Sequence, residues 1–188
     1  MKKKYMLTIA ALVFSEGVGI GRAVAVRYGS MEDKPAVYQY IHKLKTGDPA
    51  PEFRLPNLAN KAVALSDFRG KVVYLDFWFS GCKPCLAEAP ATRQLQRQFR
   101  GRDLVFVSIS VDSQDELWLR TIKDNRLAEA GAVHLLDPGR YRAANAYRID
   151  GFPAYLIIGR DGRILNSNPP RPSQKGASQA LNQALASK

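Results

Sequence analysis

Hydrophobic residues gather in one dense central run, and shorter runs follow it along the chain. The densest run covers residues 72–79, where Asp76 alone interrupts aliphatic and aromatic side chains. This length, together with the β-branched and aromatic content, predicts a strand that is buried on both faces. Beyond Gly81, apolar residues recur at helical spacing as far as Phe99, with arginines on other faces. The pattern therefore predicts a strand that leads through a short turn into a helix.

The remaining pattern predicts further strands and helices. Residues 104–111 are typical of a second buried strand, and Asp161-Gly162 between two apolar runs indicates a β-hairpin. Asp112-Ser113 is expected to cap a helix. Other short strands are expected at 53–55, 62–65, 132–136, 154–158 and 163–167, and helices at 114–127, at 140–147 and in the tail around Leu181. Strands that alternate with helices before a final hairpin and helix predict an α/β sandwich with a mixed sheet.

Length and charge narrow the class of protein. At 188 residues the chain is sized for one domain plus an extension, and its 46% hydrophobic content is ordinary for a globular protein. The formal net charge of +11 is strongly basic. The arginines are scattered and no nucleic-acid-binding motif accompanies them, so no nucleic-acid partner is expected. A basic surface attracted to anionic lipid headgroups or acidic partners fits better.

The N-terminal part of the chain is expected to be a targeting segment and a linker. A basic stretch and a short apolar run precede Ala23-Val24-Ala25, which matches the small-residue pattern of a signal-peptide cleavage site. We expect residues 1–25 to be an export signal; an uncleaved membrane anchor and a buried N-terminal helix are the alternatives. Glu16 makes the apolar run short for a bilayer. Residues 26–46 are expected to be a linker or a peripheral helix, and residues 47–188 the folded domain.

Cys82 and Cys85 are the only cysteines, and their positions suit disulfide exchange. Cys82 falls at the predicted strand-to-helix turn, and Cys85 lies one helical turn further on. Disulfide exchange needs a thiolate, and the unpaired N–H groups at a helix N-terminus favour that anion. Lys83 adds a positive charge, and Pro84 fits the first turn because its missing N–H is not needed there. A second cysteine three residues on can resolve a mixed disulfide.

Two less specific interpretations compete with redox chemistry. A structural disulfide across three residues would close a very short loop and remove little chain entropy. A zinc site would need His42 and His134 as further ligands, and neither histidine belongs to a paired ligand motif. Because C-x-x-C beside a strand–helix unit is typical of thioredoxin-like redox proteins, redox chemistry without a bound metal is the favoured prediction.

A longer motif around the cysteines resembles a known family. Residues 77–90 follow the F-W-x-x-W-C-x-P-C-x-x-E-x-P signature of TlpA/ResA/DsbE-type thioredoxin-like proteins, except that Gly81 replaces the second tryptophan. The resemblance covers residues 47–170, and residues 47–53 resemble the G-x-x-A-P-x-F entry motif of the same proteins. It implies a thioredoxin-like three-layer sandwich with a central mixed β-sheet flanked by helices, plus an N-terminal β-hairpin. The glycine changes the expected shape of the docking surface.

The resemblance also implies a substrate groove and a proton acceptor. Gly151-Phe152-Pro153 resembles the loop that carries the cis-proline of thioredoxin folds, which would lie beside the two cysteines; a trans proline is the alternative. Substrate is then expected to contact Trp78, Lys83, Pro84, Phe152 and Pro153. Asp76 and Glu88 stand where thioredoxin and ResA-like proteins keep an acid. Asp76 is expected to be the more buried and to take the proton of Cys85, whereas Glu88 either tunes the thiols or is a solvated helix residue.

Together these features predict an exported thiol–disulfide oxidoreductase that reduces protein disulfides. Cys82, expected to be exposed, would attack or receive the substrate disulfide, and the shielded Cys85 would resolve it. Lys83-Pro84 favours a reductant by resemblance. The cysteine pair is the redox group, and no cofactor is expected. The implied substrates are oxidised proteins, with the haem-site cysteines of apocytochrome c as one candidate, and the implied donor is a membrane thiol–disulfide carrier. The protein is expected to be monomeric and periplasmic or otherwise extracytoplasmic.

Two other functions remain open at this point. A thiol peroxidase usually carries a T-x-x-C motif, which residues 79–82 do not reproduce. A carrier of Cu(I) could use the two thiolates, because this soft ion accepts sulfur ligands. Such a carrier would usually add a well-placed histidine, and His134 is the only candidate within the predicted domain.

Overall fold

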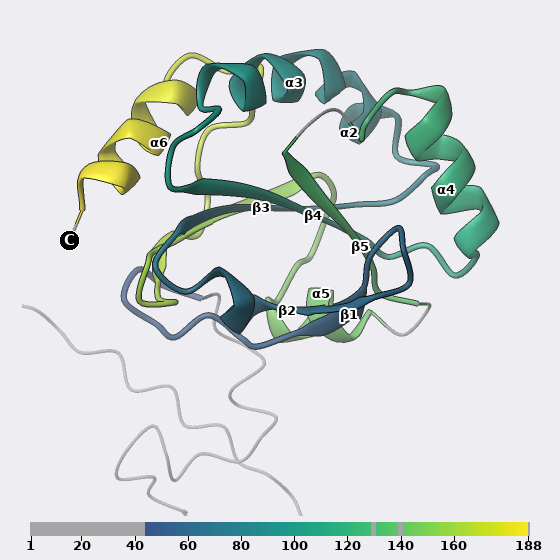
Figure 1. Ribbon diagram of the computed structural model, residues 1–188, viewed down its shortest axis with the longest axis horizontal. Helices are drawn as coiled ribbons and strands as arrows, with labels where there is room; N and C mark the ends of the chain where they lie inside the picture. Colours follow the sequence, from purple (N-terminus) through teal and green to yellow (C-terminus); the bar gives the residue numbers. More distant parts are fainter. Residues whose placement is uncertain (1–43, 129–130, 139–140, 188) are drawn as a thin grey trace, which may run out of the picture. The chain divides into compact units, whose positions relative to one another are not determined.

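The computed structural model describes residues 44–128, 131–138 and 141–187 (Figure 1). The expected export signal at residues 1–25 and nearly all of the expected linker at 26–46 lie outside these ranges. In the described part of the chain, no helix is long and apolar enough to cross a membrane.

A five-stranded mixed sheet forms the centre of the fold. Its strand order is β5-β4-β3-β6-β7, with β3, β4 and β5 parallel and with β6 and β7 antiparallel to their neighbours. The strands are β3 (Val72–Trp78), β4 (Leu104–Ser110), β5 (Ala132–Leu136), β6 (Ala154–Ile158) and β7 (Ile164–Asn166). The densest apolar run of the sequence is therefore the middle strand, where both of its faces are covered.

Helices cover one face of the sheet, and a hairpin and one short helix cover the other (Figure 1). The first layer holds α2 (Lys83–Ala87), α3 (Ala89–Gln98), α4 (Asp115–Asp124) and α6 (Ala177–Ala186). The second holds β1 (Arg54–Pro56), β2 (Ala62–Ala64) and α5 (Arg142–Ala146). β1 and β2 pair antiparallel, and a single 3-10 turn at Leu65–Phe68 leads from them to β3. The predicted three-layer sandwich with an N-terminal hairpin is confirmed.

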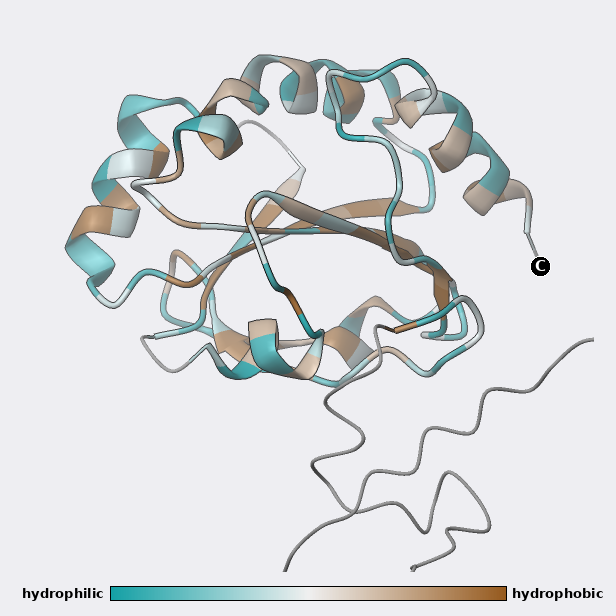
Figure 2. Cartoon of the chain, turned by 180° about the vertical axis from the view of Figure 1, so that it is seen from behind, coloured by the Kyte–Doolittle hydropathy of each residue, from teal (hydrophilic) through white to brown (hydrophobic). Residues whose placement is uncertain are grey.

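The two faces of the sheet are packed differently. Val73, Leu75 and Phe77 of β3 point into the larger core, on the side of the hairpin and α5. The opposite face is divided into two separate apolar clusters, one around Tyr74 and one around Trp78. In Figure 2 the brown, hydrophobic colour is concentrated on the strands of the sheet, whereas the helices carry mixed colours. Successive side chains of β3 point to opposite faces because a strand has a two-residue period.

Two local details differ from the sequence prediction. The helix after the cysteines breaks at Glu88, which ends α2 and precedes α3. Pro90 lies in the first turn of α3, where its missing N–H costs no hydrogen bond, so it marks the start of a new helix. Helix α4 begins after Gln114, whose side chain does not cap it, and the expected cap residue Asp112 lies two residues earlier and binds Ser80.

Candidate active site

The cysteine pair lies where β3 ends and α2 begins. Cys82 and Cys85 form a disulfide. Cys82 is the N-cap residue of α2, and its Sγ accepts a hydrogen bond from the Cys85 N–H at 3.2 Å. Pro84 occupies the first turn of the helix, as predicted. A backbone N–H that points at sulfur stabilises the anion, so this cap favours a thiolate at Cys82 in the reduced protein.

The exposure of the two cysteines differs from the prediction. In the disulfide form Cys82 is 4% exposed, whereas Cys85 is half-buried. The Cys82 N–H donates to the Phe79 carbonyl at 3.0 Å, so the tight turn directs Cys82 inward. Cys85 instead lines a small, partly open cavity under the helices. The expectation of an exposed Cys82 and a shielded Cys85 is therefore wrong for the disulfide form.

The turn that holds Cys82 is anchored by Asp112, whose role the sequence analysis missed. This buried residue lies just beyond β4, and its carboxylate accepts hydrogen bonds from the Ser80 N–H at 3.1 Å and from the Ser80 hydroxyl at 2.8 Å. The Ser110 hydroxyl donates to it at 2.6 Å. The strand order carries the missed signal, because residues that follow two neighbouring parallel strands meet at one edge of the sheet. Asp112 supports the redox turn instead of capping a helix.

An aromatic pair joins this turn to the loop before β6. The Phe79 and Phe152 rings pack edge to face with their centroids 5.4 Å apart. The Phe152–Pro153 peptide bond is cis, as predicted; Phe152 is half-buried and Pro153 is buried. A Cβ at Gly81 would lie 3.1 Å from the Phe79 ring. The Phe79 ring therefore fills the space that a side chain at position 81 would need.

The remaining expected substrate contacts fall into two groups. Lys83 and Pro84 are exposed on α2, where a substrate can reach them. Trp78 is 3% exposed and belongs to the buried cluster that contains Trp118. An indole enclosed in this way offers no surface to a protein substrate, so the expected substrate contact at Trp78 is wrong. The cause is the alternation of β3, which turns Trp78 under the helices.

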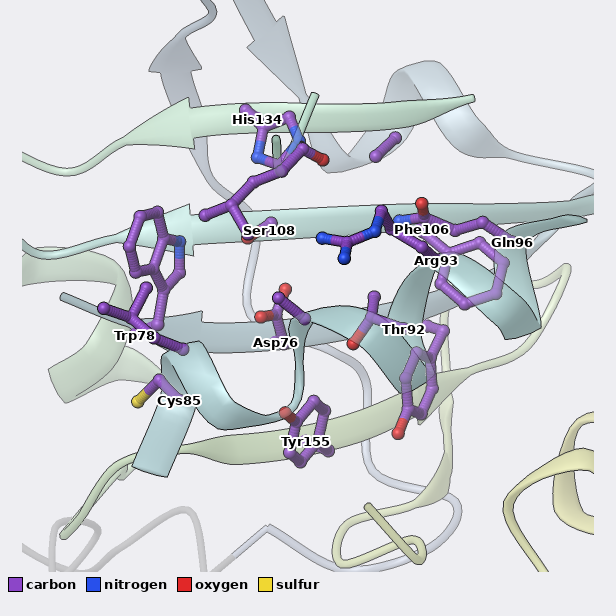
Figure 3. Close-up of a pocket in the computed structure, with 15 residues that line it drawn as sticks. Asp76, Trp78, Cys85, Thr92, Arg93, Gln96, Phe106, Ser108, His134 and Tyr155 are labelled. Carbon is purple, nitrogen blue, oxygen red and sulfur yellow. The ribbon is translucent and has the colours of Figure 1, made fainter. Parts of the chain in front are cut away.

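Asp76 lines a partly open cavity of about 50 Å³ that Cys85 also lines (Figure 3). Burial raises the pKa of Asp76 from 3.8 to about 7, although a hydrogen bond with the Ser108 side chain favours the ionised form. By exposed surface Asp76 is half-buried whereas Glu88 is 8% exposed, so the expectation that Asp76 is the more buried of the two residues is wrong, although Asp76 is the one that lines the cavity. A carboxyl group with a pKa near neutrality can accept and return a proton close to pH 7.

Asp76 belongs to a row of polar side chains that crosses the sheet (Figure 3). It pairs in register with Tyr155 of β6 and with Ser108 of β4, and Ser108 pairs with His134 of β5. All four residues line the cavity, because register partners on neighbouring strands share a face. The sequence analysis missed Ser108 and Tyr155. The alternation of side chains within each strand can be read from the sequence, but the register between neighbouring strands cannot.

His134 is a neutral hydrogen-bonding group within this row. The residue is 5% exposed, and its Nε2 lies 3.0 Å from the Leu127 carbonyl oxygen. A carbonyl oxygen only accepts, so Nε2 carries the proton. Burial lowers the pKa of His134, which favours the neutral ring. Across the described residues, no three His, Cys, Asp or Glu side chains are grouped so as to hold a metal ion.

Glu88 is tied to the C-terminal segment. Its carboxylate accepts hydrogen bonds from the Ser173 N–H at 2.9 Å and from the Ser173 hydroxyl at 2.8 Å. Glu88 is only 8% exposed, so the alternative of a solvated helix residue is wrong. Of the two expected carboxyl groups, Asp76 lines the cavity with Cys85, whereas Glu88 fastens the break between α2 and α3 to the segment before α6.

The fold and the site together define a class of protein. A thioredoxin-like sandwich carries a C-x-x-C disulfide at the end of its central strand, and a loop with a cis-proline packs against the same turn. These are the features of thioredoxin-like redox proteins. The chain belongs to the AhpC/TSA family, whose sequence profile matches residues 46–167.

Similar proteins agree on the kind of activity. The thiol-disulfide oxidoreductase ResA of Bacillus cereus (strain ATCC 10987 / NRS 248) is 28% identical over 167 residues, which are 88% of this chain and 88% of that protein. ResA of Bacillus subtilis (strain 168) is 26% identical over 132 residues, 69% of this chain and 70% of that protein. The thioredoxin domain of a thiol-disulfide oxidoreductase from Bacteroides vulgatus has a TM-score of 0.68 at 26% identity, covering 75% of this chain and 98% of that one. The present chain is a thioredoxin-like thiol–disulfide oxidoreductase.

Proposed function

We propose that this protein reduces disulfide bonds of other proteins by dithiol–disulfide exchange at Cys82 and Cys85. The shared cavity of Cys85 and Asp76 is the observation that carries the proposal. A cysteine that resolves a mixed disulfide must lose its proton first. Asp76, with a pKa of about 7, can take that proton near neutral pH.

The reaction begins with attack by the Cys82 thiolate on one sulfur of the substrate disulfide. A bond forms between Cys82 and the substrate, the substrate S–S bond breaks, and one substrate cysteine leaves as a thiolate that takes a proton from solvent. Cys85 then gives its proton to Asp76 and attacks the Cys82 sulfur. The mixed disulfide breaks, the second substrate cysteine leaves as a thiolate and is protonated in turn, and the Cys82–Cys85 disulfide forms. The substrate gains two electrons and the cysteine pair loses two.

The surroundings of the pair suit a protein substrate. Lys83 and Pro84 are exposed next to the cysteines, and Phe152 packs against Phe79 of the redox turn. In the proposal these residues, together with Pro153, form the surface on which the substrate chain lies. The basic Lys83 would also attract acidic substrates or the thiolate that leaves.

The proposed location is outside the cytoplasm. The signal-like pattern of residues 1–25 supports this location, as does the similarity to ResA proteins. Protein disulfides form and persist mainly in such oxidising compartments. A membrane thiol–disulfide carrier would then return two electrons to the cysteine pair after each turnover. The haem-site cysteines of apocytochrome c are one proposed substrate, and the protein would act as a monomer.

Trapping the mixed disulfide tests the assigned roles. Wild-type protein with dithiothreitol is expected to accelerate the reduction of insulin. Cys85→Ser should accumulate a covalent complex with insulin through Cys82, whereas Cys82→Ser should form none. Asp76→Asn is expected to slow resolution of the mixed disulfide by about 10²-fold near pH 7, because the proton acceptor is lost. A complex trapped by Cys82→Ser instead would exchange the roles of the cysteines, and a loss confined to Glu88→Gln would move the acid–base role to Glu88.

Two further measurements separate the alternatives. A thiol peroxidase would consume hydrogen peroxide in a Cys82-dependent reaction at rates exceeding those with insulin. A copper carrier would bind one Cu(I) per reduced chain tightly and lose that binding on His134 substitution. Slow peroxide turnover and weak Cu(I) binding, together with rapid insulin reduction, are the expected results.

A further inference from the structure

Three buried polar atoms around the cavity have no hydrogen-bond partner among the described residues. They are Trp78 Nε1, Gln96 Oε1 and His134 Nδ1, and each belongs to a residue that is more than nine-tenths buried and lines the cavity. Buried polar groups are bonded in the great majority of cases, so three exceptions at one cavity require an explanation. A cavity of about 50 Å³ has room for water, which can serve such groups. A side chain of the neighbouring strand, Ser108 of β4, lines the same cavity and pairs in register with His134.

The Nδ1 atom of His134 is an acceptor, because Nε2 carries the ring proton toward Leu127. Ser108 is the register partner of His134 on the neighbouring strand, and parallel strands lie about 4.8 Å apart. The Ser108 side chain also bonds with Asp76. A hydroxyl has one hydrogen to donate and can accept at the same time. Ser108 therefore stands between two acceptors, Asp76 on one side and His134 on the other.

We propose that His134 is a positioning residue for proton transfer at Cys85: its Nδ1 accepts the Ser108 hydrogen whenever Asp76 holds a proton. With Asp76 ionised, the Ser108 hydroxyl donates to the carboxylate. With Asp76 protonated, the carboxyl donates to Ser108, and Ser108 turns its hydrogen to His134. The second arrangement gives the lone pair of Nδ1 a partner and stabilises protonated Asp76. The inference rests on the proposed function in one respect, that the proton comes from Cys85.

Among the titratable groups around Asp76, only the His134 imidazole is suited to accept the Ser108 hydrogen. The titratable side chains near it are Tyr74 of β3, Tyr155 of β6, Cys85 and Glu88 at α2, Arg93 of α3 and His134 of β5. The tyrosines are acids whose pKa values burial raises further, and Glu88 accepts from Ser173. Arg93 is a permanent cation that donates to the Asn125 carbonyl at 3.1 Å. His134 is the neutral base among them.

The test follows the Asp76 carboxyl carbon by NMR across pH in oxidised, ¹³C-labelled protein, where no disulfide exchange takes place. Loss of one hydrogen bond to the protonated state is expected to lower the Asp76 pKa by about 0.5–1 pH unit. His134→Gln should show this drop, because its amide can still donate toward Leu127 but places no acceptor at the Nδ1 position. His134→Asn is the matched control: its oxygen stands near the Nδ1 position, and the expected change is below about 0.3 unit.

Ser108→Ala supplies the coupling measurement. Without the bridging hydroxyl, His134→Gln should change the Asp76 pKa by less than about 0.2 unit. Equal drops with and without Ser108, or equal effects of the Gln and Asn variants, would mean that His134 acts through packing and hydration, and would overturn the proposal. Circular dichroism checks that each variant folds; if His134→Gln does not, His134→Phe replaces it with the same expected drop.

This titration separates the inference from the proposed function, since it involves no substrate. A protein that shows the coupling of His134 with Ser108 but does not reduce insulin would refute the proposed function and support the hydrogen-bond row. A protein that reduces insulin but shows no coupling would refute the inference alone.

Discussion

At the residue scale, the turn before Cys82 is shaped by the missing side chain at Gly81. A Cβ there would lie 3.1 Å from the Phe79 ring, which is closer than ordinary van der Waals contact. The same ring packs edge to face on Phe152. It therefore cannot yield to a larger residue at position 81 without disturbing the contact with the loop that precedes β6.

Gly81→Trp, which restores the tryptophan of the related signature, is expected to cost stability through this clash. The free energy of unfolding should fall by about 0.5–1.5 kcal/mol more in the wild-type background than in a Phe79→Ala background, because only the former holds a ring that must leave its rotamer. Urea denaturation of the four oxidised proteins measures the difference. An equal effect in both backgrounds would show that Phe79 does not exclude the larger side chain.

Single residues could be predicted from the sequence where motif spacing decided their place. Cys82, Cys85 and the cis-proline at Pro153 were found in this way. The burial of Trp78 is what a strand covered on both faces implies, and the wrong expectation of a substrate contact there came from the family resemblance alone. The exposure of the two cysteines depends on the turn before the helix, whose hydrogen bonds to residues far along the chain leave no local pattern.

At the element scale, the break between α2 and α3 is fastened from outside the helices. Glu88 sits at the break, and its carboxylate accepts both hydrogen bonds from Ser173, in the segment that leads to α6. Tyr74 of the central strand donates to the Pro170 carbonyl of the same segment at 3.1 Å. The C-terminal segment thus holds the short cysteine-bearing helix in place relative to the sheet.

Glu88→Gln is expected to lower the free energy of unfolding by about 1–3 kcal/mol, because an amide has one acceptor oxygen and turns a donor toward the Ser173 N–H. Urea denaturation provides the measurement. Ser173→Ala, which removes the hydroxyl alone, should cost about 1 kcal/mol. The double variant should lose less than the sum of both, since the two residues share one contact. Strict additivity would contradict the assigned contact.

The strands and helices could largely be predicted from the sequence, but the pairing and contacts between them could not. The apolar runs predicted every strand of the central sheet to within about two residues, because period and length fix a strand locally. The register that aligns Asp76, Ser108 and His134 follows from the pairing of three separate strands. The Glu88–Ser173 contact likewise joins residues that are 85 positions apart in the sequence. No spacing rule connects such pairs in a single sequence.

At the scale of the whole molecule, Asp76 makes the stability of the fold depend on pH. Its pKa is about 7 in the folded protein and 3.8 in an exposed chain. Below pH 4 both states hold the proton, and Asp76 costs nothing. Between pH 4 and 7 the unfolded chain releases its proton while the folded protein keeps it, so stability falls as the pH rises. Above pH 7 the full cost is present.

Asp76→Asn is therefore expected to stabilise the oxidised protein at pH 8 by up to about 4 kcal/mol and to change it little at pH 4. Urea denaturation at both pH values gives the comparison. Asp103→Asn serves as the control, since Asp103 is exposed and its replacement should have a small effect at either pH. A gain at pH 8 no larger than the gain at pH 4 would show that the carboxyl pays no desolvation cost in the fold.

The polar row has a consequence for how proteins with this architecture can diverge. It lies on the face of the sheet that carries the two smaller apolar clusters, whereas the larger apolar core lies on the other face. Each of four strands contributes one position to the row. Related proteins can thus replace the residues at positions 76, 108 and 134 one strand at a time. Such replacements would change the pH at which the protein works. The core on the opposite face of the sheet, which specifies the fold, would stay unchanged.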